Sequence, residues 1–270
     1  MQLKKTWKKT IGCEQLIKKG ESTLELLEFD LLRLEKGMEY SYDTGDWEYA
    51  LVILGGSCTV MGDDFVYENI GSRRDVFSEP ATSVYIPRKR TFTIRALNEV
   101  RIAVVKSPSD LDTKPVLVRP EDVIIKTLGK PGWKRDAHFI IDERIAAKHL
   151  YIGEAYVYPG NWASYPPHKH DRERMPQEGI LEEGYYYEFN LEAGFGIQKV
   201  YTEEGDIDEI YTVRSGDLVE IPRGYHPFAC APGYFAYYLW FMAGENRGFF
   251  MSTEPAHKWI TALDVILDKQ

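Results

Sequence analysis

Two histidines separated by one residue, His168 and His170, are the clearest sign of chemistry in this chain of 270 residues. In an extended strand alternate side chains point to the same face, so both imidazoles are expected to enter one space. Thirteen residues after His170, Glu183 opens the aromatic run EGYYYEF, and His226 follows in GDLVEIPRGYHPFA. Imidazole nitrogens with a carboxylate oxygen suit a divalent transition metal, and such mixed sets with open positions are typical of catalytic sites.

The identity of the glutamate is left open by the spacing, because this stretch is rich in acidic side chains. The alternatives to Glu183 are Glu178, Glu182 and Glu188. We favour Glu183 because it directly precedes the aromatic strand and shares a face with Tyr185 and Tyr187 by strand alternation.

The elements that must position these residues are predicted to be short strands between turn residues. In the first part of the chain these runs are 49–54, 57–61, 83–86, 91–96 and 100–105; in the second they are LYIGEAYVY, the tyrosine-rich run, GFGIQKVYT, EIYTV, DLVEIP and YFAYYLWFM. Residues 24–33 fit a strand or a short helix, a strand is expected near 116–118 or 123–125, and 257–267 has a helical pattern expected to pack outside.

The strand spacing predicts an all-β fold of two tandem antiparallel β-barrels with the metal site in the second. The two halves contain similar segments, SVYIP in the first and DLVEIP in the second, and each is followed by a basic residue. The first half has neither H-x-H nor a histidine after its proline. We therefore expect a barrel without ligands over 1–115, a crossover rich in proline over 116–148, and a metal-binding barrel over 149–270.

Charge and composition exclude several function classes. The net charge is −9, from 33 basic and 42 acidic residues, and no basic run is present, which argues against nucleic acid or an anionic membrane surface as partner. Three cysteines without a CxxC pair give neither a disulfide framework nor a thiolate zinc site. No signal peptide or membrane-spanning run is evident, so a cytoplasmic protein is expected.

Residues 160–183 and 216–226 resemble the two motifs of the cupin superfamily, in which three histidines and a glutamate hold a metal inside a small antiparallel barrel. The resemblance implies the ligands His168, His170, Glu183 and His226. The chain departs from the pattern in two places: the gap before Glu183 is longer than usual, and one residue, Tyr225, separates Gly224 from His226 where two are usual. Such a ligand set serves Zn, Mn, Fe, Co and Ni alike, so the ion stays open.

A closer resemblance covers most of the chain beyond the first forty residues. The segments NWASYPPHKHD, EEGYYYEF, VYTEEGDIDE, PRGYHPFACAPGYFAYYL and FMAGE, with NIGSRRDVF and SVYIP, resemble the 5-deoxy-glucuronate isomerases of myo-inositol catabolism. Uronate isomerases of the pectin pathway share the H-x-H and the aromatic strand. The resemblance implies an aldose–ketose isomerase that converts 5-deoxy-glucuronate to 5-dehydro-2-deoxy-gluconate through an enediol, without oxygen or a nicotinamide.

Such an isomerisation needs a polarised carbonyl and a group that carries a proton between adjacent carbons. The candidates for the proton carrier are Tyr185, Tyr187, Gln198 and Tyr238. Lys199 and Arg223 are expected to bind the substrate's carboxylate, whereas Lys169, between the ligand histidines, is expected to face away. His138 and His257 are interpreted as structural.

Three alternative functions use the same pattern. An isomerase of another uronate, such as a 4-deoxy-5-hexosulose-uronate, would differ only in its substrate. An iron-dependent cupin dioxygenase would consume oxygen with an aromatic or thiol substrate, and a non-catalytic module would bind a sugar acid without turnover. The oligomeric state stays open, although an exposed aromatic surface on the first barrel would be compatible with a homo-oligomer.

Overall fold

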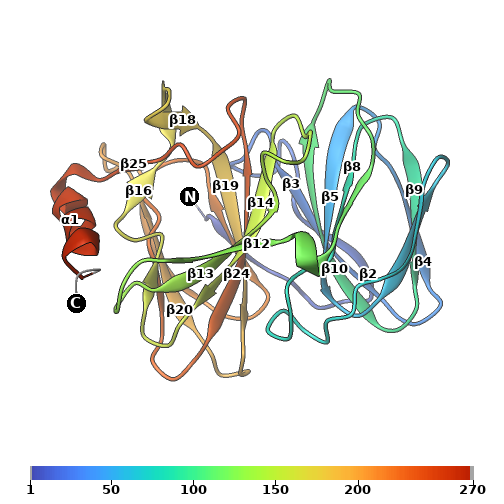
Figure 1. Cartoon of the computed structure of the whole chain (residues 1–270), viewed down its shortest axis with the longest axis horizontal. Helices are drawn as coiled ribbons and strands as arrows, with labels where there is room; N and C mark the ends of the chain where they lie inside the picture. The colour runs from blue at the N-terminus through green and yellow to red at the C-terminus, as the bar shows by residue number, and fades with distance from the viewer. Residues whose placement is uncertain (1, 268–270) are drawn as a thin grey trace.

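Strands dominate the computed structural model, which describes residues 2–267 (Figure 1). They form two barrel-shaped halves that lie side by side, each made of a large sheet facing a smaller one. Every pairing within these four sheets is antiparallel over the described residues. The predicted all-β class with two tandem barrels is confirmed, and each barrel is flattened into two sheets.

The first barrel precedes the predicted metal-ligand segment. Its six-stranded sheet has the order β11 (Val116–Val118), β8 (Ser83–Ile86), β5 (Trp47–Gly55), β10 (Val100–Pro108), β3 (Glu28–Leu34) and β2 (Gly12–Ile17). Its four-stranded sheet has the order β4 (Glu39–Asp43), β9 (Thr91–Ala96), β6 (Cys58–Gly62) and β7 (Val66–Ile70). The ambiguous stretch 24–33 therefore contributes a strand rather than a helix.

The second barrel repeats this plan. Its seven-stranded sheet has the order β1 (Lys4–Thr6), β22 (Asp217–Ile221), β19 (Glu182–Phe189), β24 (Ala236–Ala243), β14 (Leu150–Val157), β13 (Arg135–Ile141) and β12 (Ile124–Leu128). Its four-stranded sheet has the order β15 (Trp162–Ala163), β23 (Phe228–Cys230), β20 (Gly196–Tyr201) and β21 (Asp208–Val213). Two short ribbons pair β16 (His168–Lys169) with β25 (Ser252–Thr253) and β17 (Asp171–Arg174) with β18 (Glu178–Ile180).

The remaining described elements are two 3₁₀ turns, η1 (Pro120–Asp122) and η2 (Pro255–His257), and the helix α1 (Lys258–Leu267). The helix lies at the outer side of the second barrel, where the helical pattern of 257–267 placed it (Figure 1). No described helix has the length and apolar character that crossing a membrane requires.

The burial of the strands follows their place in the layers. β24 is buried at every position because one face lines the barrel and the other meets the neighbouring barrel. β20, in the outer sheet, alternates between buried and partly exposed residues because its outer face meets solvent. Buried apolar residues accordingly form one cluster inside each barrel and a third between the two large sheets.

The interface between the barrels combines apolar packing with buried polar contacts. The rings of Phe29 and Phe241, from opposite barrels, stack with their centroids 4.8 Å apart. The fully buried Arg73 holds Glu154 across the interface at 2.7 Å, and Arg101 holds Glu188 at 2.6 Å. Breaking a buried pair such as Arg73–Glu154 costs about 3–5 kcal/mol, so this contact helps to fix how the barrels meet.

Strand pairing crosses the predicted domain boundaries in three places. β1, near the start of the sequence, extends the large sheet of the second barrel by pairing with β22. β11 lies past residue 115, yet it pairs with β8 of the first barrel. β12 and β13, within the predicted crossover, belong to the second barrel's large sheet. One strand from the first part of the chain, β1, is therefore built into the second barrel, and the predicted crossover is divided between the two barrels.

Candidate metal centre

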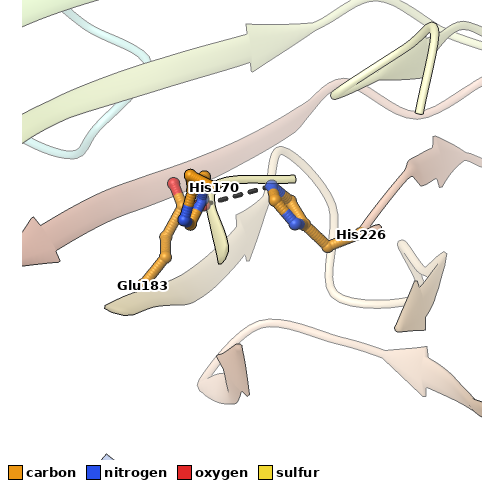
Figure 2. A group of neighbouring side chains, drawn as sticks. All are labelled: His170, Glu183 and His226. Carbon is orange, nitrogen blue, oxygen red and sulfur yellow. Dashed lines mark hydrogen bonds and ion pairs between the residues drawn. The ribbon is translucent and has the colours of Figure 1, made fainter. Parts of the chain in front are cut away.

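The predicted ligands come from three separate parts of the second barrel. His168 lies in β16 opposite Thr253, and His170 follows directly after that strand. Glu183 is the second residue of β19, and His226 lies in the connection between β22 and β23. Figure 2 shows the side chains of His170, Glu183 and His226 turned toward one another.

One carboxylate oxygen joins three of these side chains. Oε2 of Glu183 lies 3.1 Å from Nε2 of His170 and 3.1 Å from Nε2 of His226. The ligand atoms of the three residues lie within 4.8 Å of one another, and the residues are only 2%, 4% and 0% exposed in chain order. His168 stands beside this group, with its ring centroid 4.8 Å from that of His226.

Backbone carbonyls decide which nitrogen of each ring faces the carboxylate. Nδ1 of His170 lies 2.6 Å from the carbonyl oxygen of Leu181, and Nδ1 of His226 lies 2.8 Å from that of Gly224. A carbonyl oxygen can only accept, so each Nδ1 carries a hydrogen, and Nε2 is the ring atom that is turned toward Glu183. Nε2 of His226 is buried and finds no hydrogen-bond partner of good geometry among the described residues. Two imidazole nitrogens and a carboxylate oxygen that face one point are donors that a divalent metal ion binds, so the group fits a metal ion.

The pKa values of Glu183 and His168 favour the forms of these residues that bind a metal. Burial acts to raise the pKa of Glu183, but its contacts with His170 and His226 outweigh this and lower the pKa to about 2. Burial acts to lower the pKa of His170, and its hydrogen bond with Glu183 raises it above the ordinary value instead. Burial, followed by the two neighbouring imidazoles, holds the pKa of His168 well below its usual range. At neutral pH Glu183 is therefore ionised and His168 neutral, as metal ligation requires.

A cavity of about 140 Å³ adjoins the group, room for about five water molecules at ~30 Å³ each. Its polar lining comes from Arg135, Ser164, His168, His170, Glu183, Tyr185 and Tyr238. Its apolar lining comes from Leu128, Ala137, Ala155, Trp240, Met242, Phe249 and Met251. The expectation that H-x-H turns both rings into one space agrees with this wall, which contains His168 and His170. The size and mixed polarity suit a small polar ligand.

Two of the four proposed proton carriers reach the cavity. The rings of Tyr185 and Tyr238 stack with centroids 4.4 Å apart, and the hydroxyl of Tyr185 lies 2.7 Å from that of Ser164. Burial raises the pKa of Tyr185 well above its usual value, and burial raises that of Tyr238 to about 12 against the opposing charge of Arg135. Both phenols therefore hold their protons at neutral pH.

The other two proposed carriers lie behind the site. The hydroxyl of Tyr187 donates to Oε1 of Gln198 at 2.6 Å, and Nε2 of Gln198 donates to the carbonyl oxygen of His226 at 2.9 Å. Neither residue is among those that line the cavity. Their contacts hold the backbone that carries His226.

The structure does not bring Lys199 and Arg223 to the cavity. Gln198 is fully buried on β20, so Lys199 points outward by alternation, where its Nζ lies 3.5 Å from Asp208. Arg223 forms an ion pair with Asp206 on the outside of the barrel. Lys169 faces away from the cavity, as expected, and donates to Glu178 at 3.1 Å.

Two polar residues that line the cavity were missed by sequence reasoning. Arg135 lies in PGWKRD, within the stretch assigned to the crossover, where only its position as the first residue of a strand could have indicated a role. Ser164 has a positive φ of 49°, a backbone conformation that sequence alone does not reveal for a serine.

The rival glutamates each bind elsewhere. Glu178 accepts from Lys169, and Glu188 forms the ion pair with Arg101. Glu182 accepts hydrogen bonds from the backbone N–H groups of Glu25 and Leu26, at 2.7 and 2.8 Å. Glu183 alone of the four lines the cavity among the described residues.

The histidines interpreted as structural lie outside the metal group. His138 is buried with its ring centroid 4.5 Å from that of Tyr156, and His257 in η2 lies 3.4 Å from Glu254. Neither belongs to the group of three converging ligands.

Two antiparallel barrels, one of which holds an inward His–His–Glu group beside a cavity, define the bicupin class of proteins. A family model described as KduI/IolB matches residues 4–260, and the chain belongs to this family. It is 41% identical over 246 residues to 5-deoxy-glucuronate isomerase of Bacillus licheniformis, spanning 90% of this chain and 91% of the relative. It is 40% identical over 253 residues to 5-deoxy-glucuronate isomerase of Listeria innocua, spanning 93% of each.

Solved structures agree with this membership. An IolB-like protein from Salmonella typhimurium LT2 aligns with a TM-score of 0.93 at 33% identity, over 97% of this chain and 100% of the other. An oxalate decarboxylase of Lactobacillus farciminis aligns with a TM-score of 0.68 at 11% identity, over 99% and 93% respectively. The second likeness shows the shared bicupin fold alone.

Proposed function

We propose that this protein is a metal-dependent aldose–ketose isomerase that converts 5-deoxy-glucuronate to 5-dehydro-2-deoxy-gluconate in myo-inositol degradation. The observation that carries the proposal is a buried His–His–Glu group beside a small cavity, in a chain 41% identical to a 5-deoxy-glucuronate isomerase over 90% of its length. The substrate is a small sugar acid, which is consistent with the polar lining of the cavity.

The proposed metal ligands are His168, His170, Glu183 and His226. A divalent cation held there would supply a Lewis acid that stabilises negative charge on the substrate's oxygens. In His170 and His226 a backbone carbonyl accepts from Nδ1, so Nε2 of each ring already faces the proposed site. The ligand set is compatible with Zn, Mn, Fe, Co or Ni.

The isomerisation moves one proton from carbon 2 to carbon 1 and one from the hydroxyl at carbon 2 to the oxygen at carbon 1, so no electrons leave the substrate. Because Tyr185 and Tyr238 are protonated at neutral pH, we assign them to donating hydrogen bonds to these oxygens. Ser164 orients the Tyr185 hydroxyl. The two phenols keep their own protons at neutral pH, so they cannot accept the proton removed from carbon 2; we assign that role to the ionised carboxylate of Glu183, which lines the same wall. Tyr187 and Gln198 support His226 from behind.

The deciding experiment mixes metal-loaded protein with 5-deoxy-glucuronate and follows the carbon spectrum by NMR. We expect the aldehyde signals to be replaced by those of the ketose, without oxygen uptake. A chelator should stop the reaction, and a divalent ion should restore it. In heavy water the product should gain deuterium at the carbon that receives the proton, unless the base is shielded from solvent.

Two outcomes would revise the proposal differently. If 5-deoxy-glucuronate persists while a pectin-derived uronate is isomerised, the reaction class stands and the substrate is wrong. If no sugar acid reacts with metal-loaded protein, the isomerase assignment fails; tight binding of a uronate would then identify a binding module, and oxygen uptake a dioxygenase.

A further inference from the structure

Among the described residues that line the cavity, Arg135 is the one basic side chain other than the histidines. It begins β13, and strand alternation puts it on the same face as Ala137, which also lines the cavity. Arg135 therefore approaches the substrate space from the sheet's edge region, whereas Glu183 enters from the central strand β19.

The guanidinium of Arg135 has no carboxylate partner in the described part of the chain. Its one hydrogen bond there runs from Nη1 to the carbonyl oxygen of Trp133 and is long, at 3.5 Å. By contrast, Arg73, Arg101 and Arg144 hold carboxylates at 2.7, 2.6 and 2.8 Å. In a chain of net charge −9, an arginine left without an acidic partner beside a cavity is available for an anionic ligand.

We propose that Arg135 binds the carboxylate of the substrate and thereby selects sugar acids over neutral sugars. The inference rests on the proposed function and adds to it the group that recognises the acid end. A guanidinium presents parallel N–H donors that match the two oxygens of a carboxylate, which makes arginine better suited to this task than lysine. The aldehyde end of the same molecule would then face the metal group, so the two ends of the substrate are read by different parts of one cavity.

The cations predicted from the sequence do not compete for this role. Lys199 is turned outward toward Asp208, and Arg223 is paired with Asp206 and lines a separate charged hollow together with Lys169. A carboxylate bound at either place would lie outside the cavity that adjoins the metal group.

The test compares two substrates in two metal-loaded proteins, wild type and Arg135→Met. The substrates are 5-deoxy-glucuronate and its uronamide, which has nearly the same shape without the charge. Because a hydrogen bond to a charged group is worth about 1.5–3 kcal/mol, kcat/KM for the acid should fall about 10- to 100-fold in Arg135→Met. The value for the uronamide should change little, and Arg135→Lys should fall between because it keeps the charge but loses the paired donors.

Matched variants remove other positive charges. Lys134→Met deletes a charge one residue away, where the exposed Lys134 lies over the Tyr158 ring, and should leave both substrates unaffected. Arg223→Met and Lys199→Met test the sequence-based alternatives. Metal content is measured in every variant, so that loss of the ion is distinguished from loss of the carboxylate contact.

An unchanged acid-to-amide ratio in Arg135→Met would overturn the inference, as would a loss that appears in Arg223→Met or Lys199→Met instead. If wild-type protein turns over neither compound, the proposed function fails, whatever the role of Arg135. Calorimetric binding of the acid then decides the role of Arg135: a weaker Kd in Arg135→Met supports it, and an equal Kd, or no binding at all, rejects it.

Discussion

The two barrels of this protein are built on the same strand register, yet they differ in what occupies the equivalent positions. In the second barrel Glu183 lies opposite Ile221 on one side and Met242 on the other. In the first barrel Tyr49 lies opposite Ile86 and Lys106 in the same way. The position of the carboxylate ligand is thus taken by a tyrosine. Four residues after Pro222 stands His226, whereas Thr91 stands four residues after Pro87.

The barrels also differ in how their interiors are filled. Ala155 lies opposite Tyr238 on β24, and its counterpart Leu32 lies opposite Ile102 on β10. Alanine at this place leaves part of the room that forms the cavity, whereas leucine belongs to the apolar core of the first barrel. The shared backbone therefore does not create a site by itself. Small side chains leave space for the cavity, and histidine and glutamate side chains supply groups that can bind a metal.

The two barrels also differ in whether their charged side chains are paired. In the first barrel Lys106 and Asp30 are both buried and hold each other at 2.9 Å. In the second barrel Glu183 faces Nε2 of two imidazoles, and Arg135 lines the cavity without an acidic partner among the described residues. The buried charges of the first barrel pair with each other, whereas in the second barrel the carboxylate of Glu183 can bind a metal ion and the guanidinium of Arg135 can bind an anionic ligand.

The largest effect is expected from removing the histidine pair that distinguishes the second barrel. His168→Ala with His170→Ala should abolish metal loading and turnover, because two of the proposed ligands are lost. The fold should persist, since apolar burial dominates the stability of both barrels. Metal content per chain, turnover and circular dichroism test this. His257→Ala, outside the metal group, is the matched control, and retained metal at unit stoichiometry in the double variant would contradict the ligand assignment.

A smaller but still large loss of turnover is expected when Ala155 of the second barrel is replaced by leucine, the residue at the equivalent position of the first barrel. Ala155→Leu should lower turnover at least about 100-fold, because a displacement of ~1 Å at the reacting atoms already costs that much. Metal loading should remain, since Ala155 lies apart from the proposed ligands. Turnover and metal content are measured on the same preparation. Ala155→Gly, which keeps the room open, should remain active; full activity of Ala155→Leu would show that the substrate does not use this space.

The reciprocal change should affect stability rather than chemistry. Leu32→Ala deletes buried side-chain volume from the closed core of the first barrel and should cost about 2–5 kcal/mol in the free energy of unfolding. Turnover per folded chain should not change, because the cavity lies in the other barrel. Denaturant unfolding with a parallel assay measures both quantities. A large drop in turnover without loss of folded protein would reveal coupling between the barrels that the packing does not predict.

Much of the candidate metal centre could be predicted from the sequence because its signals are local. Of the four predicted ligands, His170, Glu183 and His226 converge in space, and His168 lies beside them. The place of Glu183 directly before the aromatic strand, together with strand alternation, favours it over its acidic neighbours. The repetition of SVYIP and DLVEIP likewise indicated two related barrels. Spacing along one strand or turn is a short-range property, so sequence reasoning can follow it.

The parts of the candidate site that the sequence did not predict depend on contacts between segments that are distant in the chain. Arg135 reaches the cavity only because β13 pairs with β14, and nothing in PGWKRD indicates that pairing. Tyr187 is buried inside the barrel as predicted, but its hydrogen bond to Gln198, which in turn donates to the backbone of His226, places both residues behind the site. The sequence offers Lys199 and Arg223 as cations for a carboxylate, but alternation and ion pairs on the outside of the barrel turn them away from the cavity.

The pairing of β1 with β22 limits when the second barrel can be completed during synthesis of the chain. Lys4 pairs with Val219, so β1 must wait for a partner made 215 residues later. At a synthesis rate of 5–20 residues per second, that interval is roughly 10–40 s. Until then the outer edge of β22 does not exist, and afterwards it is open to other strands unless β1 returns to cover it. The large sheet of the second barrel is therefore completed at one edge by a strand that is made before all of its other strands.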